Sequence, residues 1–189
     1  MALSMGSSCS RSPQTAAEKL TDLRTRAEKG GADAQFNLGL MYANGDGVPK
    51  DAGEALKWYR KAAEHDHASA QHKLGVMYAK GDGVPKDAGE ALKWFRKAAE
   101  QGVASAQFNL GLMYATGQGV EKDYVEAIKW FRRAADQGNA RAQNGLGTVY
   151  RNGWGVANDH VEAVKWYWKA AEQGYAHAHI PALRLSSTT

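Results

Sequence analysis

Small and apolar residues recur with helical spacing in two kinds of segment that alternate along the chain. In the first kind, Ala34, Leu38 and Tyr42 lie four positions apart, on one face of a helix of about three turns. Residues 45–50, rich in glycine, then predict a turn. The second kind begins at Asp51, and the apolar stripe of its helix consists of Ala55, Trp58, Tyr59 and Ala62.

This pair of helices recurs four times with a constant period of 36 residues. Three sets of positions keep this step: Gly39, Gly75, Gly111 and Gly147; Tyr42, Tyr78, Tyr114 and Tyr150; and Trp58, Trp94, Trp130 and Trp166. A fixed period of this length is typical of a solenoid, in which each unit packs only on its neighbours. We therefore expect one all-α domain over residues 13–185, with repeats at about 31–66, 67–102, 103–138 and 139–174.

Local signals mark the ends of the predicted helices. Asp51 and Glu54 are expected to form an N-cap with its capping-box partner, and this arrangement recurs in every repeat. Gly102 is expected to follow a second helix in left-handed geometry, as are its equivalents in later repeats. Asp66 takes this place in the first repeat, which predicts a slightly strained or altered turn. Gly39 lowers helix stability, so its recurrence inside the first helix indicates close approach of another helix.

Both ends of the array depart from the repeat. Residues 13–29 predict an additional helix of the second kind, with Ser12 as its cap and Pro13 at its first position. Residues 176–185 predict a partial helix of the first kind. These two helices would cover the ends of the core. The remaining segments are expected to be disordered tails, at residues 1–12 and 186–189.

The composition fits a soluble folded protein, since 43% of the residues are hydrophobic and 23% are charged. No apolar run reaches the ~18 residues of a transmembrane helix. No signal peptide is recognisable, so a cytoplasmic location is expected by default. A single cysteine, Cys9, excludes an internal disulfide. We expect a monomer that uses no cofactor and no metal; the histidines at 65, 67 and 72 are not spaced to converge on one ion.

The repeated residues resemble the Sel-1-like repeat (SLR) family, a relative of the tetratricopeptide repeats. The shared pattern is A-x-x-x-L-G-x-x-Y-x-x-G-x-G-V-x-x-D-x-x-x-A-x-x-W-[YF]-x-[KR]-A-A, and it matches residues 34–63, 70–99, 106–135 and 142–171. The resemblance implies a right-handed superhelix of antiparallel helix pairs that serves as a scaffold for protein–protein interaction. A cysteine-rich bacterial branch of the family is linked to β-lactam binding or hydrolysis. Its paired repeat cysteines are missing from these repeats.

In the related tetratricopeptide proteins, the first helix of each pair lines a concave groove. In this chain, the Leu-Gly dipeptide of each repeat gives the register of the first helix. Carrying the tetratricopeptide arrangement over in this register places a set of positions on the groove, and these positions vary between the repeats. They are Asp33, Phe36, Leu40, Ala43 and Asn44; Ser69, His72, Val76, Ala79 and Lys80; Ser105, Phe108, Leu112, Ala115 and Thr116; and Arg141, Asn144, Thr148, Arg151 and Asn152. Variation on a constant scaffold is expected of a recognition surface, although relaxed constraint at exposed sites would produce it as well.

These observations predict a non-catalytic adaptor that binds a protein or peptide segment in the groove, with no small-molecule substrate. Phe36 and Phe108 are the expected anchors, because aromatic side chains dominate interface energetics. Replacing both by alanine should weaken binding without unfolding the array. Trp154 and Trp168 interrupt the repeat, and they either mark an interface near the C-terminal end or pack under the terminal helix.

Two alternatives belong to other classes of function. One is a β-lactam-binding or hydrolysing enzyme, which the missing cysteines disfavour. The other is a binder of nucleic acid or anionic membrane, because the net charge is +4 and 11 of the 24 Lys and Arg residues fall on one stripe of the second helices. Acidic residues are interspersed with these cations, and basic residues late in a helix favour its dipole, so nucleic-acid binding is not expected.

Overall fold

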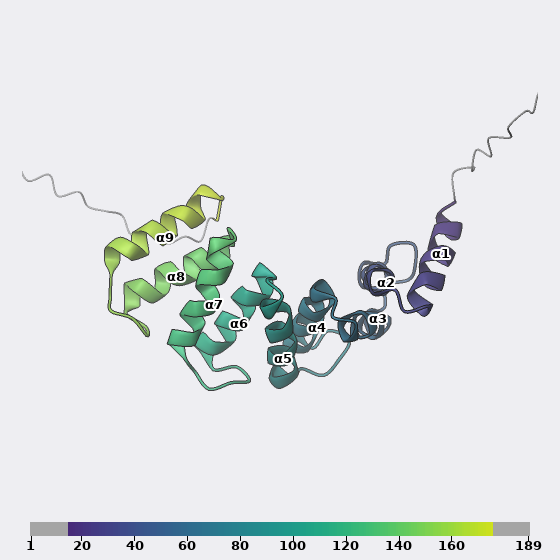
Figure 1. Cartoon of the computed structure of the whole chain (residues 1–189), viewed down its shortest axis with the longest axis horizontal. Helices are drawn as coiled ribbons and strands as arrows, with labels where there is room; N and C mark the ends of the chain where they lie inside the picture. The colour runs from purple at the N-terminus through teal and green to yellow at the C-terminus, as the bar shows by residue number, and fades with distance from the viewer. Residues whose placement is uncertain (1–14, 176–189) are drawn as a thin grey trace, which may run out of the picture.

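The computed structural model describes residues 15–175, and within this range every regular element is an α-helix of 13 residues. After the first helix, consecutive helices form four antiparallel pairs, and each helix packs mainly on its neighbours in sequence. Figure 1 shows the helices following an arc with α1 and α9 at its ends. Their bounds are α1 Ala16–Glu28, α2 Ala32–Asn44, α3 Ala52–Glu64, α4 Ala68–Lys80, α5 Ala88–Glu100, α6 Ala104–Thr116, α7 Tyr124–Asp136, α8 Ala140–Asn152 and α9 His160–Glu172. The predicted all-α repeat array is confirmed.

The invariant glycine of each first helix faces an aromatic ring of its partner helix. A Cβ atom on Gly39 would lie only 2.7 Å from Cδ1 of Tyr59. In the later pairs the corresponding distances are 2.5 Å for Gly75 and Phe95, 2.7 Å for Gly111 and Phe131, and 2.6 Å for Gly147 and Tyr167. Real Cβ contacts are not this short, so the prediction of a close helix approach at these glycines is confirmed.

The aspartates at the start of the second helices are N-caps, as predicted. Asp51 Oδ1 accepts the backbone N–H of Glu54 at 3.0 Å, and the bond recurs in α5, α7 and α9. The predicted reciprocal half of the capping box is wrong. The N–H of Asp51 instead donates to the carbonyl of Tyr42 at 2.9 Å, which ties α3 to the end of α2. The Glu54 carboxylate is left to accept from Lys57 and from the indole of Trp58.

The turn after each second helix is left-handed, as predicted. Gly102 has a φ of +89°, and Asp66 has a φ of +56° at the equivalent place. The N–H of the following residue returns to the helix in both repeats, at 3.1 Å. The turn is therefore not altered in the first repeat; the strain is that of a non-glycine residue in a region that costs it about 1–2 kcal/mol.

The first helix, α1, is the second half of an incomplete repeat, but it starts later than predicted. Its N-cap is Thr15, not Ser12, and Thr15 and Glu18 form a complete capping box. Thr15 lies 36 positions before Asp51, so α1 continues the register. Polar residues take the places of apolar ones on this helix: Lys19, Asp22 and Arg26 correspond to Ala55, Trp58 and Ala62. The predicted helix at 176–185 and both tails lie outside the described residues.

Four buried glutamines join each repeat to the helix before it, and the apolar pattern does not predict them. No side chain of the four is more than 5% exposed. Each donates from Nε2 to a backbone carbonyl in the last turn of the preceding helix, at 3.0–3.2 Å. The pairs are Gln35 with Ala27, Gln71 with Ala63, Gln107 with Ala99, and Gln143 with Ala135.

In three of the repeats, the buried glutamine also accepts a hydrogen bond. Gln71 Oε1 accepts from Nε2 of Gln101 at 2.7 Å, and the bond recurs at 2.8 Å in the next two repeats. His65 stands where the donor would be in the first repeat. Gln35 Oε1 is buried there and has no hydrogen-bond partner among residues 15–175. We use the term framework for the helix caps, the turns and the glutamine bonds that recur along the array. The first repeat therefore lacks one hydrogen bond of this framework.

Candidate binding crevices between the repeats

Three crevices open between successive repeats, at equivalent positions of the array. The first lies between α2–α3 and α4 and has a volume of 410 Å³. The second lies between α4–α5 and α6 (150 Å³), and the third between α6–α7 and α8 (520 Å³). Each is lined by an alanine of one first helix, by the lysine before the next helix, by the aromatic ring that faces the invariant glycine, and by residues of the following repeat.

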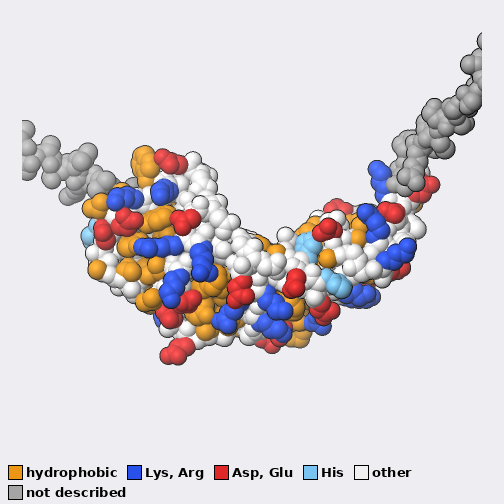
Figure 2. Space-filling view, viewed as in Figure 1, with side chains coloured by type: hydrophobic (Ala, Val, Ile, Leu, Met, Phe, Trp, Pro, Cys, Tyr) orange, Lys and Arg blue, Asp and Glu red, His pale blue; other side chains and the backbone are white. Residues whose placement is uncertain are grey.

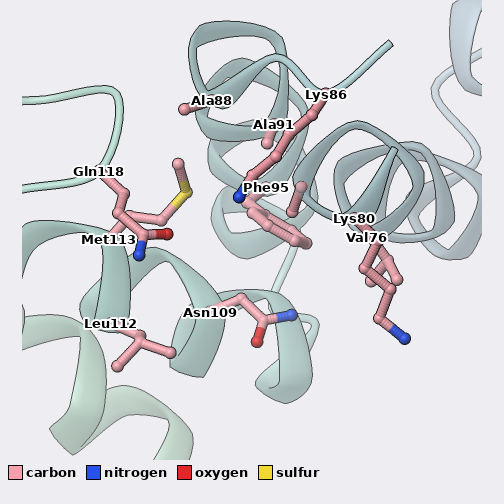
Figure 3. A pocket seen from close by; sticks show the side chains of 11 residues that line it. Val76, Lys80, Lys86, Ala88, Ala91, Phe95, Asn109, Leu112, Met113 and Gln118 are labelled. Atoms are coloured by element: carbon pink, nitrogen blue, oxygen red, sulfur yellow. The ribbon is translucent and has the colours of Figure 1, made fainter. Parts of the chain in front are cut away.

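The lining of the second crevice is drawn in Figure 3. Phe95 and Ala91 of α5 form one wall, and Leu112 of α6 lies opposite them. The ammonium of Lys86 extends into the space between these walls, while that of Lys80 points away from it. This is the smallest of the three crevices.

The third crevice has an aromatic wall that the others lack. Tyr124 stacks on Trp154, with 5.2 Å between the ring centroids and 20° between the ring planes. The equivalents of this pair are Ala52 with Asp82 in the first crevice and Ala88 with Gln118 in the second. Two neighbouring repeats thus carry matching replacements. Trp154 remains 41% exposed, so the stack presents an open aromatic face.

Two cations of the third crevice lie over aromatic rings. Lys122 Nζ lies 5.2 Å from the centroid of Tyr124, and the guanidinium of Arg141 lies 4.8 Å from the centroid of Phe108. Both side chains line the third crevice, which contains no aspartate or glutamate among its described lining residues. Neither cation has an ion-pair partner in residues 15–175.

The floor of the third crevice is widened by a glycine. Gly145 stands where the first and second crevices have Lys73 and Asn109. A Cβ atom on Gly145 would lie 3.6 Å from the ring of Phe131, an ordinary contact. Beside it, Asn144 Oδ1 is buried and accepts no hydrogen bond from any described residue. The crevice therefore combines free volume with an unused acceptor.

Eight of the residues predicted to line a groove lie in the crevices, and most of them come from α6 and α8. They are Val76, Lys80, Phe108, Leu112, Thr116, Arg141, Asn144 and Thr148. The predicted alanines lie there too, at positions 43, 79 and 115. Nine others do not line any of the three crevices: Asp33, Phe36, Leu40, Asn44, Ser69, His72, Ser105, Arg151 and Asn152.

Several of these nine side chains contact other residues of the chain. Phe36 stacks on His67 with 4.5 Å between the centroids, and Asn44 donates to Asp46 at 3.0 Å. Arg151 lies over Tyr167. The other expected anchor, Phe108, is only 8% exposed and belongs to the core. Truncating a packed phenylalanine costs about 3–5 kcal/mol, so alanine substitutions of the two anchors change packing as well as any binding.

Sequence reasoning missed the part of the third crevice that α7 and the preceding turn supply. Lys122, Tyr124 and Phe131 were not expected, because only the first helix of each pair was assigned to the groove. A signal was available at the position of Ala52 and Ala88, where the third repeat has Tyr124, one repeat before the unusual Trp168. Trp168 itself is 58% exposed and donates its indole N–H to Glu172 at 3.0 Å.

The basic residues of the second helices are engaged within the molecule. Lys57 pairs with Glu54, Lys61 lies over the ring of Trp58, and Arg60 donates to the hydroxyl of Tyr78 in the next repeat. The same three contacts recur in the following repeat, and the arginine contact starts at α1. Figure 2 shows basic side chains beside acidic ones along the outer edge of the arc. The lysines therefore make contacts within their own helices, whereas the arginines bond to the following repeat.

The histidines serve separate structural contacts. His67 caps α4 by accepting the N–H of Ala70, and it lies 3.3 Å from Asp33. His72 lies 3.2 Å from Asn109; burial, together with the charge of Lys73, holds the pKa of His72 below its usual value. Within residues 15–175, no three His, Cys, Asp or Glu side chains are grouped so that they could hold a metal ion. No helix in that range is both long and apolar enough to span a membrane.

The family model for the Sel1 repeat matches residues 32–67, 68–103, 104–139 and 140–175. The chain belongs to the Sel1 repeat family. The matched units are the helix pairs α2–α3 to α8–α9, each including its following turn, so the resemblance seen in the sequence is confirmed.

Several solved structures resemble the chain over most of its length. A protective antigen of uropathogenic Escherichia coli strains is 46% identical, with a TM-score of 0.79 over 82% of this chain and 33% of that one. A Sel1 repeat protein from Oxalobacter formigenes is 42% identical, with a TM-score of 0.77 over 81% of this chain and 63% of that one. An immunity protein from Pseudomonas aeruginosa is 28% identical, with a TM-score of 0.55 over 84% of this chain and 59% of that one.

The chain spans about a third of the length of the E. coli antigen and 63% of the O. formigenes protein. No curated protein matches it.

Proposed function

We propose that this SLR protein is a non-catalytic adaptor, which binds a peptide segment of a protein partner in the crevices between its repeats. The observation that carries the proposal is that constant and variable positions of the repeats have different structural roles. Residues that are constant in the repeats form the helix contacts, caps and glutamine bonds, whereas each crevice adds residues that vary between the repeats to a constant alanine, lysine and aromatic ring. A constant scaffold with variable crevices suits recognition of an extended segment.

The descriptions of the solved relatives are compatible with this proposal but are less specific than it. One solved relative is described as an immunity protein and another as a protective antigen. Neither description names a partner for this chain.

The proposal is tested by displaying a library of random linear peptides to the full chain and measuring the selected peptides by isothermal titration calorimetry. We expect one class of peptides to bind one to one with a Kd of roughly micromolar magnitude, about −8 kcal/mol. A library that yields no peptide above the background of an unrelated helical protein would contradict the proposal. Turnover of nitrocefin by the purified chain would favour the β-lactam alternative instead.

A further inference from the structure

The third crevice is built for a flat apolar group. Tyr124 and Trp154 form a stacked wall, and Phe108 and Phe131 also line the cavity. Its volume of 520 Å³ falls in the range of roughly 300–1,000 Å³ that is usual for ligand sites. Aromatic rings prefer stacked or edge-to-face neighbours, so an aromatic side chain is the group that this wall accommodates best.

The charges of the third crevice favour an acidic neighbour for that side chain. Lys122 and Arg141 both line it, and no described carboxylate shares the lining. In the first crevice, by contrast, Asp82 lies among the lining residues with Lys50 and Lys73. The lysines there have a carboxylate of the chain itself in the same crevice, whereas the two cations of the third crevice have only aromatic rings beneath them.

A buried acceptor completes the set of contacts. Asn144 Oδ1 has no hydrogen-bond partner among the described residues, and a buried polar group that is left unpaired lowers stability. A peptide N–H entering beside Gly145 would satisfy it. The three contacts together describe one ligand: an aromatic ring, a carboxylate and an amide N–H.

We propose that the third crevice binds a peptide segment carrying an aromatic side chain next to an acidic one. The aromatic ring enters the cavity against Tyr124 and Trp154, the carboxylate pairs with Lys122 and Arg141, and the backbone amide donates to Asn144. This inference rests on the proposed peptide-binding function and names the kind of segment that is bound.

Gly145 offers a test that fills the cavity without removing any existing contact. Because its Cβ position meets Phe131 only at ordinary distance, Gly145→Leu adds a side chain to the crevice and replaces a mid-helix glycine by a strong helix former. The matched control is Lys73→Leu at the equivalent position of the first crevice. Circular dichroism and thermal unfolding establish that both variants are folded.

The probe is a short synthetic peptide with one tryptophan flanked by glutamates in a glycine–serine background. Two reference peptides replace the tryptophan by alanine or the glutamates by glutamines. We expect Gly145→Leu and each reference peptide to weaken binding about tenfold or more, as loss of an interface anchor usually does. Lys73→Leu should change the affinity less than about threefold, because a single exposed charge contributes little. Binding of the probe should also weaken as the salt concentration rises.

The outcomes separate this inference from the function on which it rests. Equal binding of the probe to wild type and Gly145→Leu, or equal binding of all three peptides, overturns the inference. A library that selects peptides without the aromatic–acidic pair also overturns it, while the adaptor function stands. A library that selects no peptide overturns both. If a single-stranded oligonucleotide displaces the probe and binds more tightly than it does, the inference is overturned, and the occupant of the crevice is a nucleic acid.

Discussion

The first repeat (α2–α3) and the fourth repeat (α8–α9) depart from the common pattern in different places. The first repeat departs in its framework: His65 replaces the glutamine that would bond to Gln35, and Asp66 occupies a left-handed turn. The fourth keeps the framework and departs in its crevice, through Gly145 and Trp154. Departures in the framework lower stability, whereas departures in the crevice change what the surface can bind.

The largest expected effect distinguishes two glycines of α8 that lie two positions apart. Gly147→Ala places a Cβ 2.6 Å from the ring of Tyr167, and overpacking of this kind costs about 1–3 kcal/mol. Gly145→Ala meets nothing closer than 3.6 Å and should be neutral or stabilising by up to about 1 kcal/mol. Chemical denaturation measures both. Equal effects of the two substitutions on stability would contradict the distinction between Gly147, at a close helix contact, and Gly145, in the crevice.

The next prediction compares the buried glutamine of the two repeats. Gln143 accepts from Gln173 and donates to Ala135, whereas Gln35 only donates, to Ala27. We expect Gln143→Leu to destabilise the protein by about 1–3 kcal/mol, and Gln35→Leu by about 1 kcal/mol less, since one bond fewer is lost. The free energy of unfolding in urea reports the difference. A larger loss at Gln35 would contradict the assignment of the missing bond.

A smaller gain is expected from restoring that bond. His65→Gln supplies the donor that the other three repeats have, and a net hydrogen bond contributes about 0.5–1.5 kcal/mol. The melting temperature should therefore rise. As a control, His65→Ala removes the histidine without adding the donor and should not reproduce the gain. Equal melting temperatures for the two variants would count against the explanation.

The smallest effect is a dependence on pH at His72. Its pKa is lowered in the folded state by burial and by Lys73, so the folded protein takes up its proton less readily than the unfolded chain does. The contribution of His72 to stability is complete above a pH of about 6.5 and is lost as the pH falls below that value. His72→Phe, which copies Phe36 and Phe108, should reduce the loss of stability between neutral and mildly acidic pH. An unchanged pH dependence would contradict this assignment.

The fold was predictable because packing and capping repeat with the sequence. Gly39, Asp51 and Trp58 each recur four times, and a recurring constraint is visible in one sequence without any relative. The reciprocal capping box was not predictable, because the N–H of Asp51 could bond either to Glu54 or to a carbonyl of the preceding helix. Only the path of the turn brings the carbonyl of Tyr42 within 2.9 Å.

The crevices were predictable in part. Positions such as Leu112 and Thr148 were found because they vary on a helix whose other positions are constant. Lys122 was missed because it is constant in three repeats and therefore looked like a turn residue. Trp154 was noted as unusual, but its stacking partner Tyr124 is 30 positions away, and the contact between neighbouring repeats is set by the superhelix.

The most direct test of the central claim, that binding is concentrated in the third crevice, is to map the bound probe peptide by NMR. Amide chemical shifts of the full chain are recorded while the tryptophan–glutamate peptide is added. We predict that the largest changes occur at Lys122, Tyr124, Gly145 and Trp154. Changes of equal or larger size around the first crevice, at Ala52, Lys73 and Asp82, would contradict it.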